Sequence, residues 1–190
     1  LNGSGTVTGI SVGGLPDGIV DGDTLASGVG GKILQVVQTV KSDTFSQNIN
    51  FDTASNDTGL NVTITPSSNS NKIRLTGFVV VAMDQDHDSI AIQLFKNNSQ
   101  LTAAAGDADG NRSRVTSMNF VGNYGGECRS MPFDFLDSPA TTSAVTYGIR
   151  LMCLSGGSST TVYMNRSQSS GNYSYRPVSI STITAEEVAA

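Results

Sequence analysis

Charged side chains are scarce in this sequence of 190 residues. They make up 14% of it, whereas roughly 25% is usual in soluble proteins, and Ser, Thr, Asn and Gly take their place. The acidic residues outnumber the basic ones by 16 to 11, and the basic ones form no run. A surface of this kind has little means of attracting the phosphate backbone of nucleic acid. We therefore expect no nucleic-acid partner.

Long apolar runs and paired cysteine motifs are missing as well. No stretch reaches the roughly 18 apolar residues of a membrane span, and the start of the sequence lacks the basic and apolar regions of a secretory signal. We expect no membrane insertion. Cys128 and Cys153 are the only cysteines, and they form no CxxC motif for metal or redox chemistry. Each is expected to pack as a small core residue, with a disulfide between neighbouring strands as the alternative.

Catalytic patterns are also absent. The sequence has one histidine and no tryptophan, and none of its serines lies in the GxSxG context of a hydrolase nucleophile. Glu127, Asp134 and Asp137 could supply the carboxylate pair of a glycosidase, but such pairs arise by chance among 16 acidic residues. Asp137 is better explained, together with Pro139, as the end of a strand and the start of a turn. We expect a non-enzymatic protein with no catalytic residues and no cofactor.

Strand patterns fill the sequence from Lys32 onward. The clearest segment runs from Gly59 to Met83, where two stretches of alternating apolar and polar residues flank the turn-forming residues 66–71, and this predicts an antiparallel hairpin. Similar patterns recur at 32–40, 43–51, 60–65, 72–83, 89–96, 114–121, 129–136, 143–153, 159–165 and 178–187. About ten short strands and no long helix predict an all-β domain over residues 32–190, an antiparallel, jelly-roll-like β-sandwich.

The first 31 residues differ in composition from the rest. Glycine recurs every few positions, and the apolar residues are isolated, so this segment cannot build a core of its own. We interpret residues 1–31 as an extended linker or anchor. Three chains could bury the apolar side chains of this segment against one another, which favours a homotrimer. The side chains expected at this contact are Ile10, Val12, Leu15 and Ile19.

Four phrases of the sequence carry a family resemblance: GKILQVVQTVKSDTFS, GLNVTITPSSNSNKIRL, FDFLDSPATTSAVTYGIR and the closing SISTITAEEV. Over roughly residues 30 to 190 they resemble a β-domain of tail-fibre-like and other virion appendage proteins of tailed bacteriophages, marine phages and cyanophages among them. The opening GTVTGISVGGLPDGIVDGDTLA is similar to the linker that precedes this domain in fibre proteins. The resemblance implies a trimeric module displayed on the virion, at the surface of an extracellular particle.

Three functional interpretations are open from the sequence. The first is a tail-fibre or receptor-binding domain that attaches to a host surface glycan or protein and contacts other virion proteins through residues 1–31. The second keeps the fold but places the protein on the head, as a capsid decoration or head-fibre protein. The third is a cell-surface carbohydrate-binding module. The sequence departs from the resembling family in the loop 104–127, where a receptor preference would reside.

Tyrosines in polar loops are the best candidates for a binding surface. Tyr173, Tyr175 and Arg176 lie in the run NYSYR, and Tyr124 is flanked by glycines and an asparagine. A tyrosine offers a flat apolar face and a hydroxyl group at a low cost in side-chain entropy, which suits sugars and protein surfaces. The alternative is that these rings fold back onto the sandwich.

Two clusters could supply metal ligands. Asp86 and His87 lie in the acidic run DQDHD, and three copies of the histidine near a threefold axis could bind a transition metal. Asp107 and Asp109 resemble the opening of a calcium loop, but the twelfth position of that loop is Met118 instead of glutamate. For both clusters, ordinary solvated turns with Asp side chains bonded to nearby backbone amides are the favoured interpretation.

Overall fold

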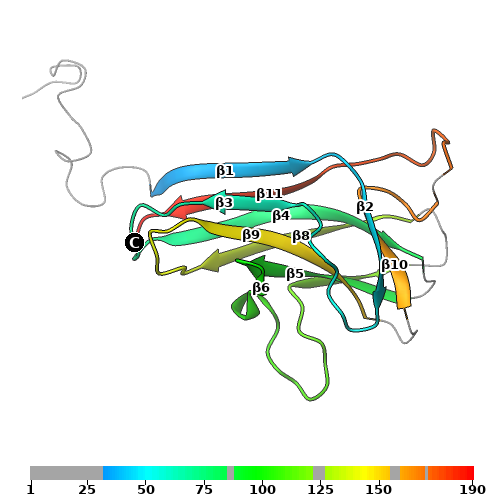
Figure 1. Ribbon diagram of the computed structural model, residues 1–190, viewed down its shortest axis with the longest axis horizontal. Coiled ribbons are helices and arrows are strands. Elements are labelled where there is room, and N and C mark those ends of the chain that lie inside the picture. The colour runs from blue at the N-terminus through cyan, green and yellow to red at the C-terminus, as the bar shows by residue number, and fades with distance from the viewer. Residues whose placement is uncertain (1–31, 85–87, 122–126, 155–158, 170) are drawn as a thin grey trace, which may run out of the picture. The chain divides into compact units, whose positions relative to one another are not determined.

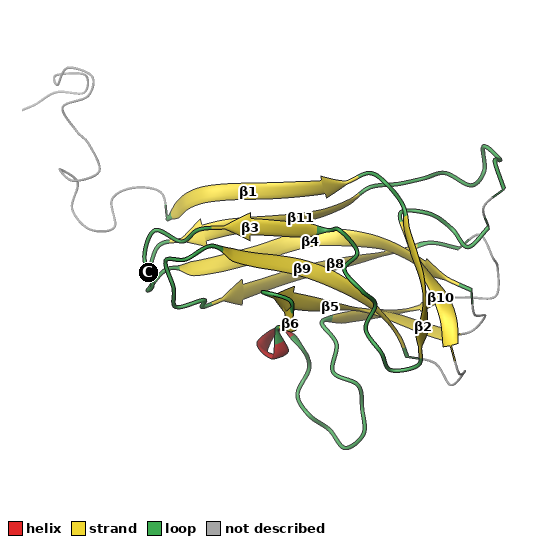
Figure 2. Ribbon diagram, in the orientation of Figure 1, coloured by secondary structure: helices red, strands yellow, loops and turns green. Residues whose placement is uncertain are grey.

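Strands make up almost all the regular structure of this protein (Figure 2). The computed structural model describes residues 32–84, 88–121, 127–154, 159–169 and 171–190. The strands are β1 (Ile33–Lys41), β2 (Phe45–Asn50), β3 (Asn61–Ile64), β4 (Lys72–Met83), β5 (Asp88–Lys96), β6 (Ser99–Gln100), β7 (Ser117–Val121), β8 (Arg129–Asp137), β9 (Val145–Cys153), β10 (Ser159–Met164) and β11 (Ser181–Val188). The one helical turn in these residues is the 3-10 helix η1 (Thr102–Ala104). Within the same ranges, no helix is long and apolar enough to span a membrane.

The strands form two antiparallel sheets (Figure 1). One has six strands in the order β1-β11-β4-β10-β2, with β8 on the other edge of β4, and the second has the order β3-β9-β5-β6, with β7 also paired to β5. β11 and β10 follow one another along a single edge of β4, and β1 and β2 continue one another beside them. β1 and β2 can be counted as one strand, and so can β10 and β11. When the short β6 is also left out and the strands are renumbered along the chain, the two sheets have the orders 1-8-3-6 and 2-7-4-5. These are the strand orders of a jelly roll, so the predicted fold class is confirmed.

The hairpin predicted between Gly59 and Met83 is wrong. β3 pairs with β9 in the five-stranded sheet, whereas β4 pairs with β11, β10 and β8 in the other. Residues 65–71 therefore cross from one sheet to the other. A period of two shows that a strand has one buried face, but it does not show which strand it pairs with. Two strands paired in a hairpin and two strands in opposite sheets of a sandwich have the same pattern.

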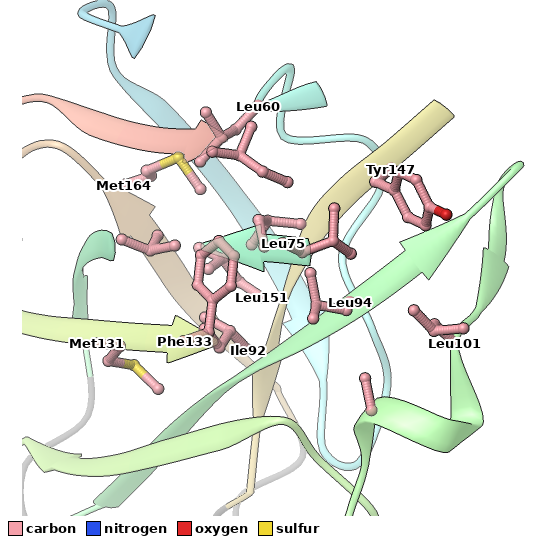
Figure 3. Packing of buried hydrophobic residues seen from close by; sticks show 14 of the residues in the cluster. Leu60, Leu75, Ile92, Leu94, Leu101, Met131, Phe133, Tyr147, Leu151 and Met164 are labelled. Atoms are coloured by element: carbon pink, nitrogen blue, oxygen red, sulfur yellow. The ribbon is translucent and has the colours of Figure 1, made fainter. Parts of the chain in front are cut away.

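The core lies between the inner faces of the two sheets. Figure 3 shows Leu75 and Met131 of the six-stranded sheet together with Ile92 and Leu151 of the five-stranded one. All four side chains are buried, and burial of each such side chain contributes roughly 1.5–3 kcal/mol. The core therefore holds together two sheets that exchange few backbone hydrogen bonds.

Two carboxylates are buried at crossings between the sheets. Glu187 on β11 and Asp137 at the end of β8 both pair with Ile73 of β4, one from each side. Glu187 faces the crossing from β3 to β4, and Asp137 begins the crossing from β8 to β9. Asp137 was expected to act in its own turn, but its carboxylate accepts hydrogen bonds from Lys96 Nζ (3.0 and 3.2 Å) and Tyr147 Oη (2.6 Å). Each crossing is thus fixed by a charged group inside the sandwich.

The other strand predictions agree with the structure to within a few residues. All ten predicted strands are present, and the two-residue β6 is the one described strand that the pattern missed. Cys128 and Cys153 are both thiols with no disulfide between them, and Cys153 packs in the core as expected. Burial raises the pKa of the Cys128 thiol. The proposed linker, residues 1–31, lies outside the described residues, so its role as linker or anchor stays a prediction.

Candidate functional site

The long segment between β10 and β11 carries three of the predicted binding residues and lines a surface cavity. β10 ends at Met164 and β11 begins at Ser181, and both strands pair with the same edge of β4. The segment 165–180 therefore leaves the sheet and returns to it almost where it left. It extends toward one end of the sandwich, at the upper right of Figure 1.

Asn165 fixes the base of this loop. It is fully buried and has a φ of 64°, a left-handed conformation that asparagine adopts more readily than most residues. Its Nδ2 donates to the carbonyl oxygens of Lys41 and Asp43 (both 2.9 Å), and its Oδ1 accepts from Ser181 Oγ (2.6 Å). The backbone N–H of Asn165 also donates to Val80 O (2.9 Å). One residue, through its side chain and its backbone N–H, thus ties the loop to three strands and to the link between β1 and β2.

The two tyrosines predicted as a binding surface stack on each other. The ring centroids of Tyr173 and Tyr175 are 5.1 Å apart, and the ring planes differ by 12°. The tyrosines are 56% and 70% exposed, so they do not fold back onto the sandwich. The Arg176 guanidinium lies 5.7 Å from the Tyr175 ring centroid. These three residues form a compact polar-aromatic group on the loop.

A cavity of about 260 Å³ opens beside this group. Its floor includes Arg166, whose guanidinium lies 4.9 Å from the Tyr163 ring centroid and donates to the carbonyls of Ser167 and Gln168 (both 3.1 Å). Sequence reasoning missed Arg166, because nothing in its local pattern distinguishes it from a solvated arginine. The described lining residues are Thr44, Arg166, Ser167, Ser169, Gly171, Asn172, Tyr173, Arg176 and Val178.

The tyrosine beneath Arg166 is held in its neutral form. Burial, followed by the hydrogen bond to Asp84, raises the pKa of Tyr163. Its hydroxyl donates to Asp84 Oδ1 (2.7 Å). The ring therefore presents an uncharged π face to the Arg166 guanidinium, an arrangement that stabilises a cation by roughly 0.5–2 kcal/mol.

The cavity brings together two cations, several hydroxyl groups and an aromatic face. Its described lining includes Arg166 and Arg176 and no carboxylate. Guanidinium groups bind carboxylate, sulfate and phosphate oxygens through charge-assisted hydrogen bonds, and the exposed Tyr173 ring can contact the apolar face of a sugar. The arrangement suits binding of an anionic group. It offers no nucleophile paired with a base.

Of the remaining predicted site residues, the structure describes only Asp107 and Asp109, and neither lines this cavity. Tyr124, Asp86 and His87 lie outside the described residues, as do Ile10, Val12, Leu15 and Ile19, so the roles expected for them stay predictions. Asp107 and Asp109 are exposed, and Asp109 forms an exposed ion pair with Arg112 (3.3 Å). In the described ranges, no three His, Cys, Asp or Glu side chains lie close enough to hold a metal ion.

The carboxylates considered for glycosidase chemistry do not form a pair. Asp134 lies on the outer face of β8, where its pKa is lowered by hydrogen bonds from Arg74 (2.7 and 3.1 Å). Asp137, three residues later, points to the inner face and is buried with Lys96. Glu127 contacts Arg129 (2.8 Å). Opposite faces of one strand cannot flank a single glycosidic bond.

Comparison with known proteins gives limited matches. The sequence matches no family model and no curated protein. Among solved structures, those of infectious bursal disease virus are similar. The Gx strain structure is 13% identical with a TM-score of 0.40, the Gt strain structure 12% with 0.39, and the derived T=1 particle 13% with 0.37. Each alignment covers 82% of this chain, but only 36–38% of the viral chain. The fold assignment therefore rests on the strand pairing described above.

Proposed function

We propose that this chain is a virion appendage domain of a tailed bacteriophage, and that it attaches to a host surface through the loop 165–180. The observation that carries the proposal is the cavity in which Arg166 and Arg176 lie beside an exposed tyrosine stack. The sequence phrases that resemble phage fibre domains suggest the biological setting. The ligand chemistry that fits is an anionic group on a host glycan or protein.

The way in which the loop is held supports a binding role. Asn165 anchors the base of the loop inside the sandwich, while Tyr173 and Tyr175 at its outer part are exposed and stacked. A tyrosine that is already stacked loses little side-chain freedom when it meets a ligand. Each site would bind weakly, and several copies on one particle would multiply the affinity.

We further propose that the chain assembles as a homotrimer. β1 is the outermost strand of its sheet, and Leu34, Val36 and Val40 on its outward face are each at least half exposed. Edge strands of this kind are usually covered or charged, and a closed cyclic assembly would cover this one. The threefold number comes from the family resemblance and from the expected packing of residues 1–31.

The trimer is tested by the molar mass of the full chain in light scattering. We expect three times the mass of one chain, and Val36→Lys is expected to weaken the assembly because it replaces an exposed apolar side chain of the edge strand with a charged one. Gln38→Lys, on the same outward face but polar already, is the matched control. A monomeric mass for the unaltered chain would contradict the proposal.

Attachment is tested on a glycan array that carries neutral, sialylated and sulfated glycans, probed with the full chain. We expect binding to acidic glycans, reduced about tenfold by Arg176→Ala because a charge-assisted hydrogen bond is lost. Arg112→Ala removes an equal charge from an exposed side chain on another loop and is expected to change nothing. Binding that survives Arg176→Ala unchanged would remove this cavity from the mechanism.

The position on the particle separates the other interpretations. Antibodies against this chain, applied to particles in electron microscopy, are expected to label the tail. Even labelling of the shell would instead identify a capsid decoration or head-fibre protein. Glycan binding without any label on particles would favour a cell-surface carbohydrate-binding module.

A further inference from the structure

A second cavity lies on the outer face of the five-stranded sheet. Its volume is about 500 Å³, within the range of roughly 300–1,000 Å³ that is usual for small-molecule sites. Thr146, Gly148 and Arg150 of β9 line it, and the odd-numbered residues of this strand face the core. The described lining residues are Asp57, Asn61, Phe95, Asn97, Asn98, Thr146, Gly148 and Arg150.

The charges in this cavity compensate each other. Arg150 is only 5% exposed; its guanidinium lies 5.1 Å from the Phe95 ring centroid and 3.0 Å from Asp57 Oδ1. Partial burial of Asp57 opposes its ionisation, but hydrogen bonds from Gly59 N and Asn61 Nδ2, together with Arg150, lower its pKa. One carboxylate thus faces one guanidinium, and the cavity as a whole is neutral.

Two neighbouring asparagines bring unused amide donors to the cavity. Asn97 and Asn98 form the turn between β5 and β6 with φ angles of 49° and 64°. Asn97 Oδ1 accepts from Thr146 N (3.0 Å), and Asn98 Oδ1 accepts from Arg150 (2.8 Å). Their Nδ2 groups make no hydrogen bond to any described residue. The hydrogen bond accepted by each Oδ1 therefore fixes the orientation of the amide, and with it the position of an N–H₂ group that has no partner among the described residues.

Acceptors lie on the opposite side of the same cavity. Asn61 Nδ2 donates to both Asp57 oxygens (2.9 Å each), which leaves Asn61 Oδ1 as an acceptor beside Gly148. A Cβ atom at Gly148 would lie 2.0 Å from that oxygen, so the glycine makes room for the amide. The Asp57 side chain is about half exposed and can accept further hydrogen bonds.

We propose that this cavity binds a neutral carbohydrate through its vicinal hydroxyl groups. A sugar hydroxyl donates one hydrogen bond and accepts others, so it fits a site where Asp57 and Asn61 oxygens face the Asn97 and Asn98 donors. The compensated charge of Arg150 gives no net attraction for an anion, unlike the cavity beside Tyr173. The two cavities therefore bind different chemical classes, and this proposal does not depend on the function proposed for the loop.

Isosteric substitutions test the site and keep the hydrogen bonds that orient the two asparagine side chains. Asn97→Asp and Asn98→Asp each keep the oxygen that accepts from Thr146 N or Arg150, and aspartate tolerates the left-handed backbone. Each removes one N–H₂ donor. Asn48→Asp makes the same chemical change at an exposed position of β2 and is the matched control.

The probe is a panel of neutral methyl glycosides of glucose, galactose, mannose and N-acetylglucosamine and their disaccharides, added to the full chain in saturation-transfer NMR. At least one sugar is expected to bind, about fivefold more weakly to each Asp variant. Asn48→Asp and Arg176→Ala are expected to leave the affinity unchanged. If an Asp variant fails to fold, as judged by circular dichroism, Asn61→Ala replaces it with the same expected loss.

Two results would overturn the proposal. One is the absence of saturation transfer from every neutral sugar at tens of millimolar. The other is transfer that is equally strong in the folded Asn97→Asp, Asn98→Asp and unaltered chains, which would place the sugar elsewhere. Neither result bears on acidic glycans at the loop 165–180, because that binding is read from Arg176→Ala.

Discussion

The buried carboxylates of the sandwich and the arginines of the loop 165–180 stand in opposite surroundings. Glu187 is 1% exposed and accepts hydrogen bonds from Ser67 N, Ser67 Oγ, Asn71 Nδ2 and Gln35 Nε2, all at 2.6–2.7 Å. Arg166 and Arg176, in contrast, share a cavity with no carboxylate among its described lining residues. The buried carboxylate is surrounded by hydrogen-bond donors, whereas the two arginines line a surface cavity.

This difference separates residues that stabilise the fold from residues that bind. A buried charge whose hydrogen bonds are all made costs a great deal when one partner is removed. Arg166 and Arg176 are only partly buried, and a charge that solvent can reach contributes less to folding. Substitutions in the interior should therefore change stability alone, and substitutions in the loop should change binding alone.

The largest effect is expected for a glycine in the interior. A Cβ atom at Gly77 on β4 would lie 2.2 Å from the backbone oxygen of Thr182 and 2.8 Å from Phe133 Cζ. The backbone of β11 cannot withdraw without losing its pairing with β4, so Gly77→Ala is expected to lower the free energy of unfolding by about 3 kcal/mol. Urea unfolding measures this change.

The matched substitution in the loop is Gly171→Ala. The new Cβ would lie 2.5 Å from the ring of Tyr173, which is an exposed side chain that can turn away. The expected stability loss is under about 1 kcal/mol. Equal losses in Gly77→Ala and Gly171→Ala would contradict the division between interior and loop.

The next effect concerns Glu187. Glu187→Gln replaces one acceptor oxygen with an N–H₂ group. If the remaining oxygen keeps the donors of Ser67 and Asn71, the N–H₂ group faces the donor of Gln35, and the substitution is expected to cost about 2–3 kcal/mol. Glu186→Gln, one residue earlier on the outer face, changes only a long contact with Arg74 (3.6 Å) and is expected to cost under about 0.5 kcal/mol. A comparable loss in both variants, measured by urea unfolding, would show that the network around Glu187 contributes little.

Stability should also depend on pH through the same carboxylate. Burial raises the pKa of Glu187, but hydrogen bonds from Asn71, Gln35 and Ser67 outweigh this and lower it from the usual 4.5 to about 2. Below pH 4.5 the unfolded chain binds a proton at this site that the folded chain does not, so stability falls until the pH passes about 2. Above pH 5 the contribution is complete.

The measurement is the difference in urea midpoint between the unaltered chain and Glu187→Gln from pH 6 down to pH 2. We expect the difference to be constant above pH 5 and to shrink steadily below it. A difference that stays constant down to pH 2 would mean that Glu187 has an ordinary pKa in the folded chain.

Much of the fold could be predicted from the sequence, because strands such as β1, β3 and β8 have one face that is more buried than the other and a clear period of two. The segment 72–83 is a strand with the expected ends, and 60–65 contains β3. Their partners could not be predicted, because pairing is decided by distant residues. Glu187 fixes the turn between these two strands from β11, more than a hundred positions away in the sequence.

Less of the candidate sites could be predicted. Tyr173, Tyr175 and Arg176 lie close together because they are neighbours in the sequence. Arg166 joins them only because Asn165 brings the two ends of the loop together inside the sandwich. The second cavity gathers residues from three separate segments, and no local pattern connects Asp57 with Asn98 or Arg150.

Only a small change in stability is expected for Arg176→Ala, although this substitution is expected to abolish most of the binding to acidic glycans. The guanidinium contacts the exposed Tyr175 ring, and loss of such a contact costs roughly 0.5–1 kcal/mol. Urea unfolding of Arg176→Ala and Glu187→Gln, together with binding of both to the same acidic glycan, therefore gives opposite orders of effect. If Arg176→Ala destabilised the chain as much as Glu187→Gln does, the arginine would serve the fold, and a role of this residue in binding would lose its support.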